Sequence, residues 1–359
     1  MEKRAKGGGL RRIETGHRAS ETRTWPAALL AALSLLIVPA GAAAQTKAGT
    51  TIGAFVGIEP SARIGAMGNA GVAIYDGIQS IYYNPAALGP ASQIALQFTH
   101  GFWFADISYD YAAVLLPVRG WGSFFGSLMA LNSGDIDVRT VDQPLGTGER
   151  YTAEDVALSL GYGREITDRF GAGVQVNYIN ETIFHSSMHV VTFNIGTVYR
   201  LSQTGLTLGS SLSNFGTHGR FSGRDLAIQY DNDPNRFGDN SSLPGEQLTD
   251  DFPVPILFRV GVTWPRQLGN DSEVLLAVDA FHPSDNTESL SLGWEWLWKE
   301  ALAVRAGYQT LGQRDSELGL TAGLGLRGAL GQYRFQLDYG WAHHTTLQET
   351  HRLTFVLGL

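Results

Sequence analysis

The sequence of 359 residues contains no cysteine, which excludes disulfide scaffolds, thiolate metal sites and cysteine catalysis. Charged residues make up only 17% of the chain, and the net charge of −8 argues against nucleic acid as a partner. There are only 13 prolines, and the 44 glycines follow no three-residue period, so the chain is not collagen-like. With 43% apolar residues, the chain is also too hydrophobic to be disordered as a whole.

Long apolar runs are scarce as well, and the longest uninterrupted one covers residues 27–38. It is shorter than the roughly 20 residues that a membrane-spanning helix needs, which excludes a polytopic helical membrane protein. Basic residues that include Arg18 and Arg23 precede this run, and the small residues Ala42–Ala44 follow it. This order predicts a secretory signal peptide over residues 1–44 and hence an exported protein. An N-terminal membrane anchor is the alternative.

After residue 90 the dominant pattern is an alternation of apolar residues with polar residues or glycine. Over residues 333–341, for example, Tyr333, Phe335, Leu337, Tyr339 and Trp341 share one face, and the residues between them share the other. Side chains alternate across a strand, so the pattern indicates amphipathic strands. Fourteen such segments occur, at residues 93–105, 107–118, 121–132, 153–166, 168–182, 187–200, 203–215, 254–265, 271–282, 286–298, 301–312, 316–328, 331–341 and 347–359.

The length of these segments and their connections indicate a membrane barrel. Most are longer than the 5–6 residues typical of globular strands and reach the roughly 9–11 residues that a membrane-spanning strand needs. Every second connection is short, and these short connections would lie at one end of a barrel. The two long connections, 133–152 and 216–253, would both lie at the opposite end. Trp296 and Trp298 precede a short turn on the apolar face, as in an interfacial aromatic girdle. We therefore predict an all-β fold, a transmembrane antiparallel barrel of about 14 strands over residues 93–359, in the lipid of a Gram-negative-type outer membrane.

Residues 45–92 do not alternate. They are rich in closely spaced small residues, and Asn84-Pro85 is a turn signal. A compact segment ahead of a barrel predicts a small N-terminal hatch inside the lumen. The simpler alternative is an ordinary N-terminal strand and loop.

Two motifs in this segment resemble a known family. The run from Arg63 to Ala73, with Gly65, Met67 and Gly68, is followed by residues 80–88, which contain Asn84, Pro85 and Ala86. Together with residues 208–216 and 302–308, these motifs are similar to the PorV/PorQ family of FadL-like outer-membrane barrels. The resemblance implies a fourteen-stranded barrel and a hatch that carries the Asn-Pro-Ala motif. Residues 75–78 depart from the family pattern, and so does the non-aromatic C-terminal Leu359.

The resemblance implies two different functions. A PorV-like protein is an accessory of type IX secretion, whose partners are secretion-apparatus subunits and secreted cargo proteins. A FadL-like protein is a channel for long-chain fatty acids or other hydrophobic small molecules. The sequence favours the secretion accessory and keeps the channel as the alternative, with a purely structural surface protein as a third class.

The sequence offers little for an enzyme or a cofactor site. The glycines of 323–328 spell G-x-G-x-x-G, but they lie inside an alternating strand with no following helix, where glycine avoids bulk in the lumen. Residues 231–239 fail the EF-hand pattern, because Arg236 takes the glycine position and Ser242 the bidentate glutamate position. His343-His344 falls in an expected loop, and nothing near Ser187 and His189 completes a catalytic triad. We therefore expect no enzymatic activity, no cofactor and no metal.

Ionisable residues recur on the face opposite the apolar one. An arginine that faced lipid near the midplane would cost about 2–4 kcal/mol, so these residues are expected inside the barrel. They carry both signs, and we predict a lumen network that clamps the hatch, with a selectivity filter as the alternative. The set comprises Arg259, Asp279, Glu295, Arg305, Arg327, Arg334, Asp338 and Arg352.

Overall fold

The computed structural model describes residues 49–201, 205–233, 235, 242–313 and 316–359. The predicted signal peptide, residues 1–44, and the first residues of the predicted hatch lie outside this range. No helix within the described residues is long and apolar enough to cross a membrane.

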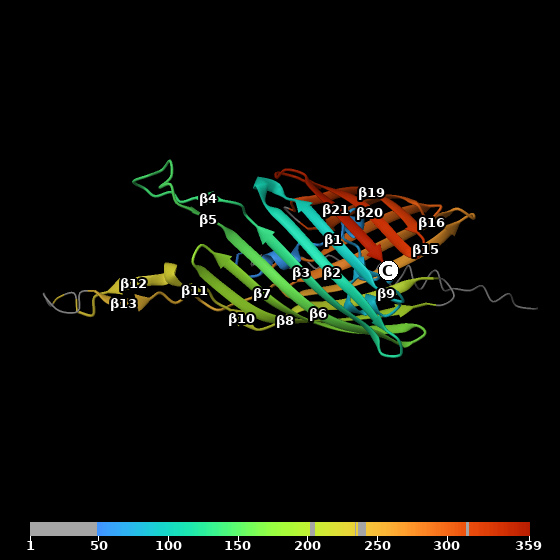
Figure 1. The fold of residues 1–359 in the computed structure, drawn as a ribbon, viewed down its shortest axis with the longest axis horizontal. Helices are drawn as coiled ribbons and strands as arrows, with labels where there is room; N and C mark the ends of the chain where they lie inside the picture. The colour runs from blue at the N-terminus through green and yellow to red at the C-terminus, as the bar shows by residue number, and fades with distance from the viewer. Residues whose placement is uncertain (1–48, 202–204, 234, 236–241, 314–315) are drawn as a thin grey trace, which may run out of the picture. The chain divides into compact units, whose positions relative to one another are not determined.

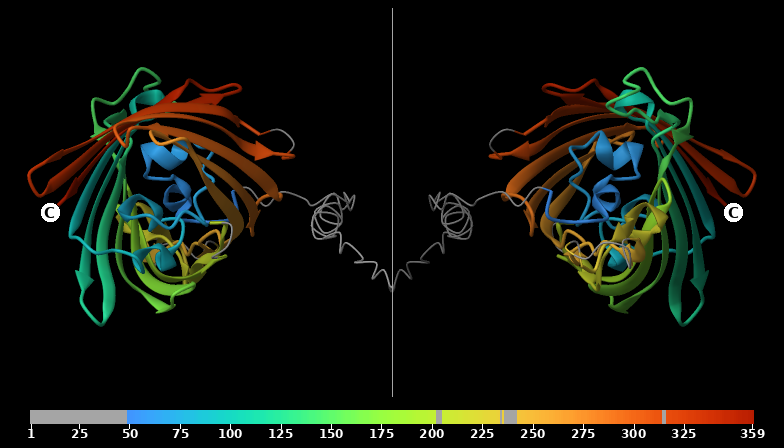
Figure 2. Two further views of the ribbon diagram at one scale, coloured as in Figure 1. Left: turned by 90° about the vertical axis from the view of Figure 1, so that its right-hand side faces the viewer. Right: turned by 90° about the vertical axis from the view of Figure 1, so that its left-hand side faces the viewer.

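Fourteen antiparallel strands form a closed barrel (Figures 1 and 2). Neighbouring strands in the chain pair with each other, and β1 closes the ring by pairing with β21. The count and the positions confirm the prediction to within a few residues at each end. The strands are β1 (Ala95–Phe102), β2 (Ser108–Val118), β3 (Gly122–Asn132), β6 (Ala153–Thr167), β7 (Phe170–Ile183), β8 (Ser186–Arg200), β9 (Thr207–Gly216), β15 (Leu257–Leu268), β16 (Ser272–Pro283), β17 (Ser289–Trp298), β18 (Leu302–Leu311), β19 (Leu318–Leu330), β20 (Tyr333–His344) and β21 (Thr350–Gly358).

The two ends of the barrel differ, as the connection lengths predict. At one end, here called the loop end, the connections 133–152 and 217–256 project well beyond the strands (Figure 1). The first contains β4 (Ile136–Asp137) paired with β5 (Arg150–Tyr151), and the second contains β12 (Ala227–Tyr230) paired with β13 (Leu243–Glu246). The second also includes β11 (Ser222–Gly223), β10 (His218–Gly219) and its partner β14 (Phe252–Pro253). Short connections join the strands at the opposite end, here called the turn end.

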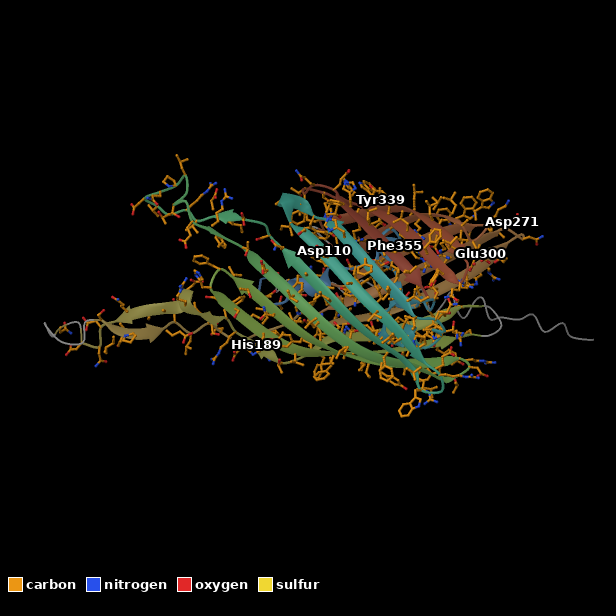
Figure 3. The ribbon with its side chains drawn as sticks, in the orientation of Figure 1. Asp110, His189, Asp271, Glu300, Tyr339 and Phe355 are labelled. Atoms are coloured by element: carbon orange, nitrogen blue, oxygen red, sulfur yellow. The ribbon has the colours of Figure 1, made fainter. Side chains whose placement is uncertain are left out.

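The outer face of the barrel is apolar. On β19, Leu320, Leu324 and Leu326 are each more than half exposed, whereas Thr321, Gly323 and Gly325 face the lumen. Phe355 and Tyr339 stand on this outer face in Figure 3. Trp298 lies at the turn end of β17 on the same face, where the aromatic girdle was predicted. Such a surface is stable only when lipid covers it, and the closed ring leaves no strand edge unpaired.

Residues 49–92, here called the inner segment, lie inside the barrel (Figure 2). They form four short helical turns, η1 (Ala54–Gly57), α2 (Ala62–Gly65), η2 (Ile78–Ser80) and η3 (Pro85–Leu88). The Ser61 hydroxyl caps α2 by accepting a hydrogen bond from the Ile64 amide. Asn84 caps η3 in the same way, with Pro85 at the first position of the turn.

Glycines line the wall where the inner segment touches it. On nine strands, a Cβ atom added to at least one glycine would lie within 3.0 Å of residues 62–88. The missing side chains therefore make room for backbone and side-chain atoms of residues 62–88. These nine residues, here called the glycine belt, are Gly163, Gly173, Gly196, Gly209, Gly261, Gly293, Gly307, Gly323 and Gly340.

Candidate functional site: the filled lumen

The strongest attachment of the inner segment to the wall joins Arg63 to Glu295. Helix α2 presents Arg63 to β17, where its Nε and Nη2 atoms each donate a 2.8 Å hydrogen bond to one carboxylate oxygen of Glu295. The remaining Nη1 atom of Arg63 lies 2.8 Å from Asp76, which belongs to the inner segment itself. Burial alone would lower the pKa of Arg63, but the carboxylates of Asp76 and Glu295 raise it well above its ordinary value, so Arg63 stays charged.

Two further residues extend this attachment along the wall. The Arg305 Nε atom donates a 2.5 Å hydrogen bond to Glu295, and its Nη1 atom lies 2.8 Å from Asp338. Asp338 also accepts a 2.8 Å hydrogen bond from Gln79 of the inner segment. Arg327 lies farther away, 3.8 Å from Glu295. We call the six charged residues Arg63, Asp76, Glu295, Arg305, Arg327 and Asp338 the ion network.

The other four lumen residues predicted from the sequence lie outside the ion network. Asp279 accepts a 2.8 Å hydrogen bond from the backbone amide of Val72. Arg259 and Arg352 are buried against aromatic rings, with Arg259 5.5 Å from the ring centre of Tyr82. Arg334 is exposed at the turn end. The structure therefore divides the predicted set among separate places in the lumen.

Among the predicted hatch-motif residues other than Arg63, Gly68 and Asn84 contact backbone atoms of the wall. Gly68 has a φ of 66°, and a Cβ atom there would lie 2.5 Å from the Leu292 carbonyl oxygen. The Asn84 side chain donates hydrogen bonds to the carbonyl oxygens of Val72 at 2.8 Å and of Thr197, on β8, at 3.0 Å. The remaining motif residues are buried with them: Gly65, Met67, Pro85 and Ala86.

Sequence reasoning missed a group of uncharged polar side chains on β6–β8, here called the amide wall: Ser159, Gln175, Asn177 and Asn194. They bond to one another, with Asn177 accepting from Ser159 at 2.8 Å and donating to Asn194 at 3.2 Å. A cavity of about 30 Å³ separates them from Tyr82 of the inner segment. The alternating amides at 175 and 177 were a visible signal, but a search for charge overlooks them.

Two larger cavities lie toward the turn end, with volumes of about 820 Å³ and 400 Å³. Arg63, Asp76 and Arg327 line both of them. Arg334 and Lys299 line the larger cavity only. The ion network therefore borders both cavities.

The other chemical motifs do not form sites. The glycines of 323–328 lie in β19, and no group of three or more His, Asp or Glu residues that could hold a metal occurs among the described residues. His343 and His344 were expected in a loop, but β20 extends to His344 and places the two on opposite faces. His189 stacks on Tyr178 outside the barrel (Figure 3), and no hydrogen bond joins it to Ser187. Residues 234 and 236–239 of the acidic loop lie outside the described residues.

Neither a protein-family model nor a curated protein matches this chain. Among solved structures, the Pseudomonas putida toluene transporter TodX is 14% identical, with 84% of this chain and 98% of that chain covered and a TM-score of 0.54. The monoaromatic hydrocarbon channel CymD is 11% identical, with 83% and 96% covered and a TM-score of 0.50. At such low identity the likeness shows the fold alone. This chain therefore has the β-barrel fold of TodX and CymD.

Proposed function

We propose that this chain is an outer-membrane channel for small hydrophobic molecules and that residues 45–92 are its hatch. The observation that carries the proposal is a barrel of the TodX fold whose lumen holds a segment attached by named polar contacts. The sequence favours a PorV-like secretion accessory, but the barrel has the fold of TodX, a toluene transporter, and of CymD, a monoaromatic hydrocarbon channel. A channel for hydrophobic molecules is therefore the leading proposal.

The contacts suggest how the hatch works. The glycine belt lets residues 62–88 lie in direct contact with the wall, which supports a hatch that obstructs the lumen. Passage then requires part of the inner segment to move. The ion network holds the segment on the β17–β20 side, where the large cavities bring water close to the charges. Local rearrangement there would open a path without unfolding the barrel.

Uptake by whole cells tests this function. Cells that express the chain should accumulate radiolabelled toluene faster than cells that express a closed barrel of equal abundance. Entry of a small hydrophilic sugar should stay at the background rate, because the filled lumen offers no aqueous pore. Equal toluene accumulation in both strains would refute the proposal.

A second candidate function is the PorV-like accessory role in type IX secretion. The observation that favours it is the exposure of apolar side chains on the long connections at the loop end. Val141 and Leu145 are 99% and 95% exposed, and Leu248 is 75% exposed. Cargo proteins and secretion-apparatus subunits are the proposed occupants. Replacing Val141, Leu145 and Leu248 together by serine should then abolish co-purification of secreted proteins but leave the barrel assembled.

A further inference from the structure

The lumen is divided between a charged side and a neutral side. The ion network occupies the wall formed by β17–β20. On β6–β8 the ionisable inward residues lie near the strand ends, with Asp155 and Glu181 at the loop end and Glu165 and Arg200 at the turn end. Between these ends the inward positions hold only glycine, apolar residues, amides and hydroxyls. A ligand at mid-height on this side meets no charge from these strands.

The amide wall retains unused hydrogen-bonding capacity. The Nε2 atom of Gln175 donates a 2.5 Å hydrogen bond to Asn177. The Oε1 atom of Gln175 has no hydrogen-bond partner, although the residue is only 8% exposed and lines the 30 Å³ cavity. A buried acceptor left unpaired costs about 1–3 kcal/mol. A ligand that donates a hydrogen bond to this atom would recover that cost.

The opposite side of the same cavity is aromatic and apolar. Tyr111, Phe125 and Met129 line it from β2 and β3, and Val56 and Tyr82 line it from the inner segment. Burial raises the pKa of Tyr82, so its phenol is neutral. The Arg259 guanidinium lies 5.5 Å from the Tyr82 ring centre but does not line the cavity. Among the described residues no cationic side chain lines the cavity itself, and Arg259 lies over the Tyr82 ring.

We propose that this pocket binds the hydroxyl end of an uncharged hydrophobic molecule, a phenol or an alcohol, through the Oε1 atom of Gln175. This inference rests on the proposed channel function and names its substrate class. A volume of about 30 Å³ admits a group the size of a water molecule, which suits a hydroxyl. A carboxylate would be buried here without a cation in the pocket lining and is disfavoured relative to a hydroxyl.

The apolar body of the ligand enters when Val56 and Tyr82 move. The Tyr82 hydroxyl donates a 2.7 Å hydrogen bond to the Val56 carbonyl, so the two side chains cover the pocket as a unit. Glycines flank this turn, with Gly53 at a φ of 68° and Gly57 in open space. Lifting this turn would break the 2.9 Å hydrogen bond from the Gly53 amide to Glu181 and the 3.0 Å hydrogen bond from the Tyr109 hydroxyl to the Ile58 carbonyl, but not the attachment of α2 to Glu295.

Three probes of similar size test the proposal on the full-length mature protein in lipid nanodiscs. Isothermal titration calorimetry compares p-cresol, toluene and benzoate. The wild-type chain should bind p-cresol tightest and benzoate weakest. The substitution Gln175→Leu keeps the side-chain size but removes the acceptor. It should weaken p-cresol binding about fivefold and leave toluene unchanged, since one neutral hydrogen bond is lost.

Gln97→Leu is the matched control, because Gln97 is also a buried lumen amide with an unpartnered Oε1 atom but does not line this pocket. Its p-cresol affinity should equal that of the wild type. If benzoate binds tightest, or if both variants weaken p-cresol equally, the substrate class is wrong although the channel function stands. If no probe binds, the channel function fails as well.

A single introduced thiol provides a readout that does not depend on the Leu variants. The chain has no cysteine, so Ser127→Cys places one thiol in the pocket wall. p-Cresol should slow its modification by a small methanethiosulfonate reagent, and benzoate at the same concentration should not. Equal protection by both compounds would overturn the assignment.

Discussion

Arg63 and Glu295 are 232 residues apart in the chain and meet inside the barrel through two parallel hydrogen bonds of 2.8 Å. Arg63 belongs to the inner segment and Glu295 to strand β17, so the pair joins the proposed hatch to the wall. A two-pronged arginine–carboxylate contact holds orientation as well as distance. Both side chains are at least nine-tenths buried, and breaking one partner leaves an uncompensated charge.

Neutralising the wall side of this contact should loosen the hatch. In a double variant that carries Glu295→Gln and Arg305→Gln, Arg63 keeps only Asp76 as a charged partner within the ion network. We expect a higher ion conductance in planar lipid bilayers, because water and ions gain a path past α2. Arg334→Gln is the control, since Arg334 is exposed and forms no ion pair among the described residues. An unchanged conductance in the double variant would eliminate the clamping role.

The glycine belt predicts a steric effect. A Cβ atom at Gly307 would meet the Gly68 amide nitrogen, so Gly307→Ala should destabilise the folded barrel by about 1–3 kcal/mol. Urea unfolding in detergent, followed by the heat-dependent shift of the barrel on gels, measures this. Gly319→Ala on β19 has open space around its Cβ and should have little effect. An equal loss of stability in both variants would show that these glycines stabilise the strands themselves and do not act by making room for the inner segment.

Asn84 predicts a separate hydrogen-bonding effect. Asn84→Ala removes the cap of η3 and leaves the Val72 and Thr197 carbonyl oxygens without its amide donor. We expect about 2–3 kcal/mol of lost stability in the same unfolding assay. Asn286→Ala, in an exposed loop, should stay within about 0.5 kcal/mol of the wild type. A loss below that limit for Asn84→Ala would contradict the proposed attachment.

The outer face predicts how charge is tolerated. Leu324→Arg places a cation at the middle of β19 on the apolar face and should cost about 2–4 kcal/mol, because the charge faces lipid. Folding of each variant into lipid vesicles, measured at increasing urea concentrations, gives the difference in the free energy of folding. Leu347→Arg lies in the connection between β20 and β21 and should fold like the wild type. Similar behaviour of the two variants would argue against a membrane around this surface.

The strands were predictable because their alternation is local. Tyr333 to Trp341 show the two faces of β20 directly in the sequence, and the membrane requires the apolar residues to point outward. His343 and His344 were misplaced at the end of the same strand, because polar residues near the water boundary weaken the alternation. Strand ends are therefore the least certain part of such a prediction.

The lumen was only partly predictable. The alternation of faces along the strands predicts that Glu295, Arg305 and Asp338 point into the lumen. It cannot predict their partners Arg63 and Gln79, because these two residues come from a segment without periodicity. Parity also cannot separate Arg259 and Arg352, which pack on aromatic rings, from the ion network. Gln175 and Asn177 were not predicted as lumen residues because they are uncharged. Their burial in the lumen nevertheless makes their amide groups candidates for hydrogen bonding.

The most direct test of the account is a gentle detergent purification from the native outer membrane, followed by mass spectrometry of all bound proteins and small molecules. The account predicts a barrel that elutes without secretion partners and carries a hydrophobic small molecule close to one-to-one. Large secretion-apparatus subunits, or exported proteins that share one C-terminal domain, with no small molecule bound, would contradict it and restore the secretion function.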